Sequence, residues 1–535
     1  MIKNIRIKNL RSLVDTGRIE LKPLTVLVGK NSSGKSTFAR TFPLLRQSIE
    51  EATKGPILWY GRLVDFGDFI TSKSRFTESP NIEFSFDFEV RSERLGRYIS
   101  QNDFTYYDRI YRKFSHEKTS NASERYLLSL SICMNYKDST KISRIDLKIF
   151  GIDCRIDYDH SGNPSIFIDN VLYWEKTDDR RALNAHTNGI LPKINFIKRR
   201  KMQHPEEGTV IRWVADDPFD KKLFDSIKKL VHANTSDHRI NRLIHNLPLC
   251  PFESFVSEIQ SIYGAPASWT NAVKGYATHK KSTVLSNIYR HVIANSLFPL
   301  MDYLNDELIK YFKNVNYIEP LRATAQRYYR GQELSVSSID SKGANVAFYL
   351  DSLSRNEKNH FDAWVNKLFN EKIIAERQGG HIALKVKKEG NSYSTNIADI
   401  GFGVSQLLPI LVQLWQASYH VQVPRRRGVS RKVKTIVIEQ PELHLHPEYQ
   451  AKIAEAMVSA ITMSDNYNKL NVIVETHSPS IVNRIGKLVA DGVISSSSVN
   501  ILLFEHDEQN GSQIHEAGFD ENGVLKNWPY GFFEY

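Results

Sequence analysis

An eight-residue segment near the start of the chain has the residue types and the spacing that can hold a polyphosphate. Residues 29–36 read GKNSSGKS and fit the pattern G-x-x-x-x-G-K-[ST] without a mismatch. The glycines let the backbone curl so that successive N–H groups point at phosphate oxygens, and a following helix adds partial positive charge. In this pattern Lys35 bridges the β- and γ-phosphates of ATP and Ser36 ligates Mg²⁺. The expected phosphate-binding residues are Gly29, Asn31, Ser33, Gly34, Lys35, Ser36 and Thr37.

A second segment, near the other end of the chain, supplies the acidic side chain that such a loop needs. Residues 435–442 read TIVIEQPE, an apolar run typical of a buried strand, with Glu439 at its carboxyl end. Open α/β sheets bind ligands at this end of their strands, so we expect Glu439 to hold Mg²⁺ together with Ser36. A solvated acidic loop after a core strand is the alternative interpretation.

In ABC-type ATPases, which the order of motifs described below resembles, the residue after the metal-binding acid is a glutamate that acts as the base, and this resemblance implies slow hydrolysis here. Gln440 comes next, and an amide cannot accept a proton as a carboxylate does, although it can orient a water molecule. Glu442 is the carboxylate that could serve as the base in its place, provided that a turn returns it to the γ-phosphate. We therefore expect ATP binding to act as a clamp or switch.

The pattern of apolar residues predicts the elements that position these groups. A buried strand at 24–29 precedes the loop, and a helix at 35–52 follows it, with a kink or an early break at Pro43. Further strands are expected at 63–70, 81–90, 435–439, 471–475 and 499–506.

Between these halves the character of the sequence changes. Polar, tyrosine-rich and lysine-rich segments alternate with short strands near 127–170, and helical patterns dominate from 218 to 314. We therefore predict an α/β fold: a P-loop nucleotide-binding domain with a mostly parallel sheet, split by a large, mixed but mainly helical insertion. The expected division is 1–90, 91–315 and 316–535, with no long coiled coil.

Composition narrows the class of protein. The 535 residues are 41% hydrophobic and 24% charged, with a formal net charge of +11, which permits contact with nucleic acid or with an acidic partner. The three cysteines have no zinc spacing, and we expect no metal at His444 and His446. Neither a signal peptide nor a run of about 18 apolar residues is visible, so we expect a cytoplasmic protein without a membrane segment.

The order of motifs resembles that of the ABC/SMC-like ATPases. The phosphate loop is followed by GFGVSQLLPIL (401–411), IEQPELHLHP (438–447) and VIVETHS (472–478), as in AAA-type members related to OLD-family ATPases. The segments 317–329, 341–350 and 519–535 are similar to the PtuA-like ATPases of Septu and retron-linked antiphage systems.

The resemblance implies roles for matching residues. Gly403, Ser405 and Gln406 stand in the place of the ABC signature, which caps the γ-phosphate held by another subunit, so a homodimer or a higher oligomer is implied. His477 matches the switch histidine that senses the γ-phosphate, which completes a catalytic set with Glu439, Gln440 and Glu442. Read without the resemblance, GFGVSQ is an ordinary helix cap and His477 a structural histidine.

The resemblance also implies partners. For PtuA-like proteins these are an HNH endonuclease (PtuB-like) and, in retron systems, a reverse transcriptase with its DNA–RNA product. No nuclease motif is visible in this chain. Two basic segments could grip nucleic acid, dock an acidic protein or simply be solvated. They are 198–201 and the group Arg425, Arg426, Arg427, Arg431 and Lys432.

Three other functions stay open. The first is a RecF- or SMC-like ATPase that acts directly on DNA in repair or chromosome maintenance. The second is an assembly scaffold that binds ATP without hydrolysing it. A transporter ATPase is the least favoured, because the long insertion splits the site and the signature departs from LSGGQ.

Overall fold

The structure is a computed structural model that describes residues 1–91, 125–185, 189–204, 208–277, 283–330, 338–400, 402–419, 432–464 and 468–529. The chain divides into two compact units, and each takes several segments of the sequence. Unit 1 comprises residues 1–8, 48–58 and 79–310, and unit 2 comprises 9–47, 59–78 and 311–535. The predicted division at 90/91 and 315/316 stays a prediction.

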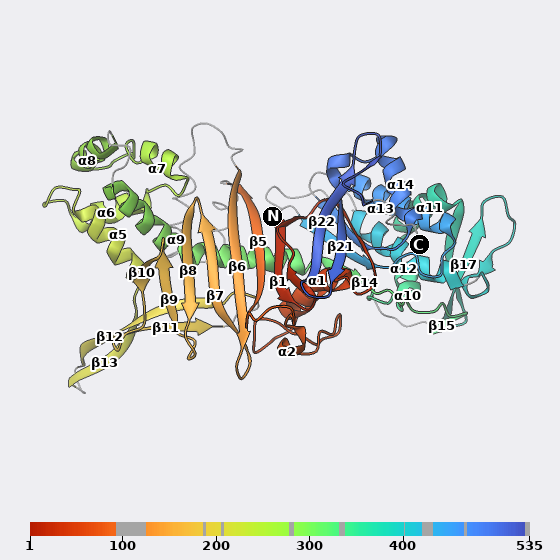
Figure 1. The fold of residues 1–535 in the computed structure, drawn as a ribbon, viewed down its shortest axis with the longest axis horizontal. Helices are drawn as coiled ribbons and strands as arrows, with labels where there is room; N and C mark the ends of the chain where they lie inside the picture. Colours follow the sequence, from red (N-terminus) through yellow and green to blue (C-terminus); the bar gives the residue numbers. More distant parts are fainter. Residues whose placement is uncertain are drawn as a thin grey trace. The chain divides into compact units, whose positions relative to one another are not determined.

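Unit 1 contains most of the central segment and is built from strands followed by helices (Figure 1). Its strands are β1 (Ile2–Leu10, through residue 8), β5 (Ile82–Arg91), β6 (Arg125–Tyr136), β7 (Thr140–Ile149), β8 (Ile152–Tyr158), β9 (Pro164–Ile168), β10 (Val171–Trp174), β11 (Arg180–Ala185), β12 (Lys193–His204) and β13 (Gly208–Ala215). Its helices are α5 (Pro218–Lys228), α6 (Asp237–His245), α7 (Phe252–Glu258), α8 (Ala267–Ala277) and α9 (Thr283–Phe312, through residue 310).

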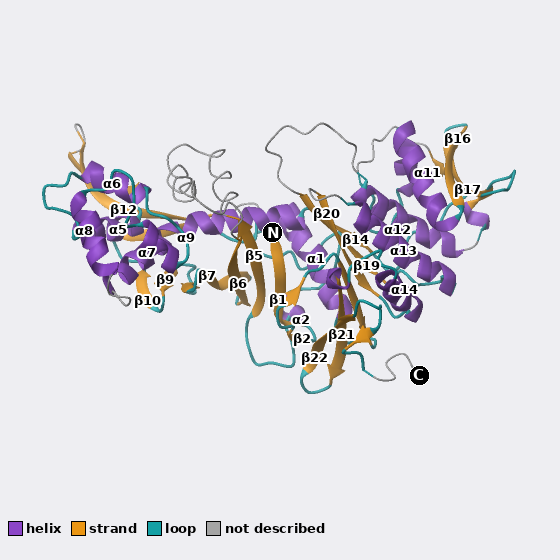
Figure 2. Cartoon of the chain, turned by 90° about the horizontal axis from the view of Figure 1, so that it is seen from above, coloured by secondary structure: helices purple, strands orange, loops and turns teal. Residues whose placement is uncertain are grey.

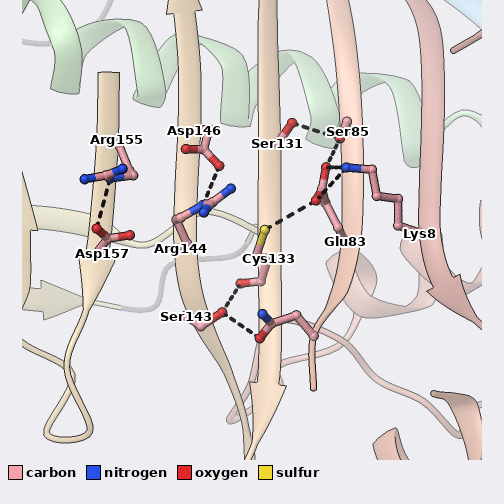
Figure 3. Close-up of polar contacts among 11 residues, drawn as sticks. Lys8, Glu83, Ser85, Ser131, Cys133, Ser143, Arg144, Asp146, Arg155 and Asp157 are labelled. Atoms are coloured by element: carbon pink, nitrogen blue, oxygen red, sulfur yellow. Dashed lines mark hydrogen bonds and ion pairs between the residues drawn. The ribbon is translucent and has the colours of Figure 1, made fainter. Parts of the chain in front are cut away.

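The larger sheet of unit 1 is antiparallel, in the order β10-β9-β8-β7-β6-β5-β1. Apolar side chains alternate with polar ones along strands such as β5 and β8, as a sheet with one buried face requires. Paired residues such as Phe84 and Ile132 are both buried. On the polar face, Lys8 pairs with Glu83 at 3.2 Å, and Ser131 donates to Ser85 at 2.8 Å (Figure 3). Cross-strand contacts of this kind fix the register.

Unit 2 carries the phosphate loop and the C-terminal half of the chain. Its strands are β2 (Leu13–Asp15), β3 (Ile19–Glu20), β4 (Leu24–Gly29), β14 (Val315–Ile318), β15 (Tyr329–Arg330), β16 (Glu371–Gln378), β17 (His381–Lys388), β18 (Thr395–Asn396), β19 (Lys432–Glu439), β20 (Asn468–Glu475), β21 (Val499–Asp507), β22 (Gly511–Phe519) and β23 (Leu525–Lys526). Its helices are α1 (Lys35–Glu50, through residue 47), α2 (Phe69–Ser72), α10 (Val346–Ser352), α11 (Arg355–Phe369), α12 (Phe402–Ser418), α13 (Pro447–Met463) and α14 (Pro479–Ala490), with 3₁₀ turns η1 (Ile397–Asp399) and η2 (Ser496–Ser498).

The main sheet of unit 2 has the order β2-β22-β21-β4-β20-β19-β14. From β21 to β14 all neighbouring strands are parallel. Helices α12, α13 and α14 gather beside these strands (Figure 2) and share one apolar cluster with alternate strand residues such as Val26 and Ile438. On the opposite face Phe38 of α1 lies 6.0 Å from Phe504 of β21, measured between ring centres. The predicted α/β fold with a mostly parallel sheet is confirmed.

Two local expectations need correction. The segment 63–70 is not a strand: Asp68 caps α2, its side chain accepting from the Thr71 N–H, and Thr71 bonds back to the Asp68 N–H. Such a capping box favours a helical turn over an extended chain. Helix α1 does not break at Pro43 but continues to Glu50. The basic run 198–201, for which a solvated loop was one of the alternatives, lies in strand β12.

Candidate functional site

The turn between β4 and α1 requires glycine at two positions. Gly29 has φ of 150°, and a Cβ there would lie 2.3 Å from the Phe504 carbonyl oxygen. Gly34 has φ of 98°, and a Cβ there would lie 2.7 Å from Ser512 Oγ. Any larger residue would therefore force the loop away from β21 and β22. Both glycines allow the backbone to curl tightly around the start of α1.

This turn forms most of the wall of a pocket of about 150 Å³. The wall is completed from other elements by one residue before β2, one after β19 and one at the end of β20. The lining residues are Ser12, Asn31, Ser32, Ser33, Gly34, Lys35, Ser36, Thr37, Gln440 and Glu475. The pocket therefore joins groups more than 400 residues apart in the sequence.

Lys35 is the buried cation of the pocket. Its Nζ donates to the carbonyl oxygens of Gly29 at 3.0 Å and Lys30 at 2.6 Å. Burial lowers the pKa of Lys35, and the negative charges of Glu475 and Glu442 act in the opposite direction. An ammonium group held at the N-terminus of a helix in this way is suited to bind an anion.

Two carboxylates end neighbouring strands beside this lysine. Glu439 of β19 and Glu475 of β20 are direct partners in the parallel register, and Glu475 is also paired with Leu27 of β4. Both side chains are only 2% exposed. The carboxyl ends of β4, β20 and β19 therefore lie at one edge of the sheet, which is where α/β sheets bind ligands.

Glu475 faces the phosphate loop. Its Oε1 accepts a hydrogen bond from Ser36 Oγ at 2.8 Å, whereas its buried Oε2 has no hydrogen-bond partner in the described part of the chain. Burial raises the pKa of Glu475 to about 7, and the charge of Glu439 adds to this effect. The bond from Ser36 and the charge of Lys35 oppose it.

Glu439 is held by other groups. Arg40 of α1 donates from Nε at 2.8 Å and from Nη2 at 2.7 Å to its two oxygens, and Tyr317 donates its hydroxyl at 2.9 Å. The hydrogen bond to Glu439 raises the pKa of Arg40. A two-pronged contact of this kind neutralises the carboxylate and fixes its orientation. In this structure, then, Ser36 bonds to Glu475 and Glu439 bonds to Arg40.

The chain after β19 turns sharply and rejoins β20. Gln440 has φ of 42°, and its N–H donates to the Glu475 carbonyl oxygen at 2.8 Å. Glu442 accepts from the His477 N–H at 2.7 Å and from Thr476 Oγ1 at 2.9 Å. Burial raises the pKa of Glu442, although these bonds act against it. Glu442 therefore ties the two loops together, while Gln440 lines the pocket.

His477 lies in the loop that Glu442 holds. Its Nε2 is buried and has no hydrogen-bond partner among the described residues. Burial and the nearby charge of Lys35 lower its pKa, which favours the neutral imidazole at pH 7. A neutral imidazole with a vacant ring nitrogen can donate to or accept from a phosphate-bound group. Its sensing role stays a prediction.

The proposed signature opens α12, which begins at Phe402. A Cβ at Gly403 would lie 3.1 Å from the His444 carbonyl oxygen, so this helix end packs closely on the loop after β19. Ser405 and Gln406 are buried, and the Gln406 side chain exchanges hydrogen bonds of 3.2 Å with the backbone of Arg322. Their contact with nucleotide on a second copy stays a prediction.

Several other predicted residues cannot be placed in the site. Arg425, Arg426, Arg427 and Arg431 lie outside the described residues, and of Lys432 only the backbone is described, at the start of β19. His444 and His446 are exposed, and His446 caps α13 by accepting from the Glu448 N–H.

Sequence reasoning missed four residues that shape the site. Glu475 carried a usable signal, because it ends an apolar strand just as Glu439 does. Tyr317 and Arg322 lie in a segment noted only for its resemblance, and Arg40 lies in the helix predicted at 35–52, with no signal that marks it. Arg322 donates to the carbonyl oxygens of Glu439 and Gln440 at 3.1 and 3.0 Å, and burial lowers its pKa to about 10.

The fold and this pocket together define a P-loop nucleotide-binding protein. More narrowly, the chain belongs to the AAA ATPase domain family, whose model matches residues 1–482. Residues 494–534 match a second family, described as a protein of unknown function, DUF3696. No curated protein matches the chain. In the described part of the chain, no helix combines the length and apolar character needed to cross a membrane.

Two solved structures of SMC head domains are similar at a low level. One is the Smc head domain of Pyrococcus furiosus with an extended coiled coil, bound to the C-terminal domain of ScpA. It is 9% identical, the match covers 97% of this chain and 96% of that chain, and the TM-score is 0.32. The other is the SMC head domain of Thermotoga maritima. It is 8% identical, the match covers 96% of this chain and 98% of that chain, and the TM-score is 0.32. At this score they add nothing to the assignment, which rests on the strand order, the loop and the family.

Proposed function

We propose that this chain binds ATP with Mg²⁺ and hydrolyses it slowly, as the ATPase subunit of an antiphage defence complex of the Septu or retron type. The observation that carries the nucleotide part is the pocket in which the loop 29–37 meets Gln440 and Glu475. The antiphage part is supported by the sequence resemblance to PtuA-like ATPases.

The residues of the pocket fit a nucleotide and its metal. Gly29 and Gly34 leave room where a Cβ would collide, and the N–H groups of a loop followed by a helix suit phosphate oxygens. Lys35 would bind the β- and γ-phosphates. Ser36 would ligate Mg²⁺ beside the partnerless oxygen of Glu475, or with Glu439 as the sequence predicts. When bound, Mg²⁺ would supply a Lewis acid that neutralises charge on the transferred phosphoryl group.

The groups around the pocket that could accept a proton are engaged elsewhere, which favours slow hydrolysis of ATP. Gln440 lines the pocket where its amide can orient water but cannot take a proton. The Glu439 carboxylate is neutralised by Arg40, and that of Glu442 already accepts two hydrogen bonds. Glu475, the remaining carboxylate of the pocket, would be occupied by Mg²⁺. Because a well-placed general base contributes about 10²- to 10⁴-fold to the rate, a site without a free one would bind ATP and hydrolyse it slowly.

Slow hydrolysis suits a subunit that uses ATP to assemble. Each chain has one phosphate loop, so a second copy would supply the signature residues Gly403, Ser405 and Gln406 across the nucleotide. The resulting dimer, or a higher oligomer built from it, would position and restrain an HNH nuclease. In a retron system the reverse transcriptase and its DNA–RNA product would join the same complex.

The test combines nucleotide binding with complex size. Purified chain should bind a fluorescent ATP analogue and turn ATP over slowly, and Lys35→Ala should lose binding while keeping its circular dichroism spectrum. Co-expressed with an HNH nuclease encoded beside it, the chain should elute as a larger complex with ATP than without. Fast hydrolysis that DNA stimulates in the lone chain would instead support the RecF- or SMC-like alternative. Equal elution with and without ATP, and no association with the nuclease, would reject the defence assignment.

A further inference from the structure

The three-stranded sheet β11-β12-β13 of unit 1 has one covered face and one open face. Ile194 and Phe196 of β12 point to the covered face, where the Phe196 ring lies 5.6 Å from that of Phe219 of α5 and 5.1 Å from that of Phe298 of α9. Side chains alternate along a strand, so odd-numbered β12 residues point the other way.

The strand register identifies the members of the open face. Arg181 is paired with Ile197, Arg199 with Trp213, and Lys201 with Ile211. Directly paired residues share a face, and Arg181 confirms this by lying over the Trp213 ring, 4.7 Å from its centre. The open face therefore includes Arg181, Leu183, Asn195, Ile197, Arg199, Lys201, Ile211 and Trp213. Figure 1 shows the three strands side by side.

Two properties of this face are unusual for a solvated surface. Leu183 is 52% exposed, Ile211 46% and Trp213 38%, so apolar groups gather on it, whereas isolated exposed apolar residues would need no explanation. Its charges are of one sign: Arg181, Arg199 and Lys201 lie on it, and β11, β12 and β13 contain no Asp or Glu on either face. The neighbouring acidic residues lie outside the strands, among them Asp179 and Asp216 before and after the sheet and Glu206 and Glu207 between β12 and β13.

We propose that the open face of β11-β12-β13 binds single-stranded nucleic acid. Arg181, Arg199 and Lys201 would contact phosphates, and Trp213 would stack on a base. Cations along a strand combined with an exposed aromatic ring are the features by which proteins bind single strands without sequence preference. Arg199 and Lys201 are two residues apart on β12, which separates them by about 7 Å along the strand.

The charge on this face favours a polyanion over an apolar protein partner. A second copy docking here would bring two sets of like charges together. The few apolar side chains of this face would not offset the free energy of that repulsion. A nucleic acid supplies both negative phosphates and apolar ring faces, which match the two kinds of side chain present. The inference is independent of the nucleotide pocket, since all its residues lie in unit 1.

The experiment measures binding of the full chain to a fluorescent oligonucleotide by anisotropy over a range of salt concentrations. The wild-type chain should bind single-stranded DNA or RNA, with duplex bound less tightly. Arg181→Ala/Arg199→Ala/Lys201→Ala should lower the slope of log affinity against log salt concentration by about 2, since each of the three lost phosphate contacts contributes about 0.7 for single strands. Trp213→Ala should weaken binding about 10-fold, and Trp213→Phe should restore most of it.

A triple variant with the same loss of charge serves as the control. Lys141, Lys221 and Lys229 are exposed cations of unit 1 outside this sheet, and their replacement by alanine should change binding little. All variants must keep the ATP-analogue binding of the wild-type chain, which shows that they are folded and separates this test from that of the ATPase.

Three results would overturn the proposal. The first is an affinity and a salt slope that stay equal to those of the wild-type chain in both the triple variant and Trp213→Ala. The second is an equal loss in the control triple variant, because net charge alone would then explain binding. The third is tighter binding to duplex or to poly-glutamate than to single strands, which would assign the face to duplex DNA or to an acidic protein.

Discussion

Replacing Glu475 by glutamine should make the protein more stable above neutral pH in the absence of Mg²⁺. The carboxyl group is 2% exposed and stands beside the charge of Glu439, and together these raise its pKa to about 7 from an ordinary value of 4.5. Folding thus favours the protonated form. Glutamine is neutral at every pH and keeps an oxygen that can accept the hydrogen bond from Ser36.

The size and sign of the effect follow from proton linkage. Between pH 4.5 and 7 the folded chain binds more protons at Glu475 than the unfolded chain, so stability falls as pH rises through this window. The difference of about 2.5 units between the folded and the ordinary pKa corresponds to a loss of about 3 kcal/mol in the free energy of unfolding. This loss is complete above pH 7 and absent below pH 4.5. Glu475→Gln should therefore match the wild-type protein at pH 4.5 and exceed it at pH 8.

Thermal unfolding in EDTA at pH 4.5, 6 and 8 measures this difference. For a chain of this size we expect the variant to unfold a few degrees higher than the wild-type protein at pH 8. Glu521→Gln, at an exposed carboxylate of the same unit, is the matched control and should change the unfolding temperature equally little at every pH. Adding Mg²⁺ with a non-hydrolysable ATP analogue should erase the advantage of the variant, because the metal favours the ionised carboxylate of the wild-type site.

Two outcomes would refute this reasoning. If Glu475→Gln lowered the unfolding temperature at pH 8 as much as at pH 4.5, the side chain would be ionised and satisfied in the folded protein. If the advantage persisted unchanged with Mg²⁺ and nucleotide, Glu475 would not contact the metal, and Glu439 would become the remaining candidate for its ligand.

Three further predictions concern the same pocket. Gln440→Glu should raise the rate of ATP hydrolysis at least 10-fold, because it places a proton acceptor in the pocket wall, and single-turnover assays would measure it. Lys35→Ala should abolish binding of a fluorescent ATP analogue without altering the circular dichroism spectrum, whereas retained binding would remove the lysine from the site. Arg40→Ala should destabilise unit 2 by about 3 kcal/mol in denaturant unfolding, since it leaves Glu439 buried without its cation; an unchanged midpoint would mean that the ion pair does not form in solution.

The fold could be predicted where local pattern decides it. Six consecutive buried residues form β4, and the apolar runs before Glu439 and Glu475 form β19 and β20 as expected. Segment 63–70 was misread because its apolar residues resemble a strand, while the pair Asp68 and Thr71 sets a helical turn. A short capping box outweighs weak periodicity over eight residues.

The candidate site could be predicted only in part, because its decisive contacts join distant residues. The hydrogen bond from Ser36 to Glu475 and the ion pair of Arg40 with Glu439 each span about 400 positions of the sequence. Pattern places both carboxylates at strand ends, yet it does not say which one faces the phosphate loop. That depends on strand order: β20 lies between β4 and β19, so Glu475 is the nearer of the two.

The same strand order explains why two buried carboxylates can coexist here. Paired side by side at the ends of β19 and β20, they repel each other, and one must be neutralised for the sheet edge to be stable. Arg40, on the helix that the loop begins, neutralises Glu439 permanently, which leaves Glu475 to take up a proton or a metal ion. A single cation on α1 therefore divides the pair into one structural and one reactive carboxylate. The reactive one is the group that touches Ser36.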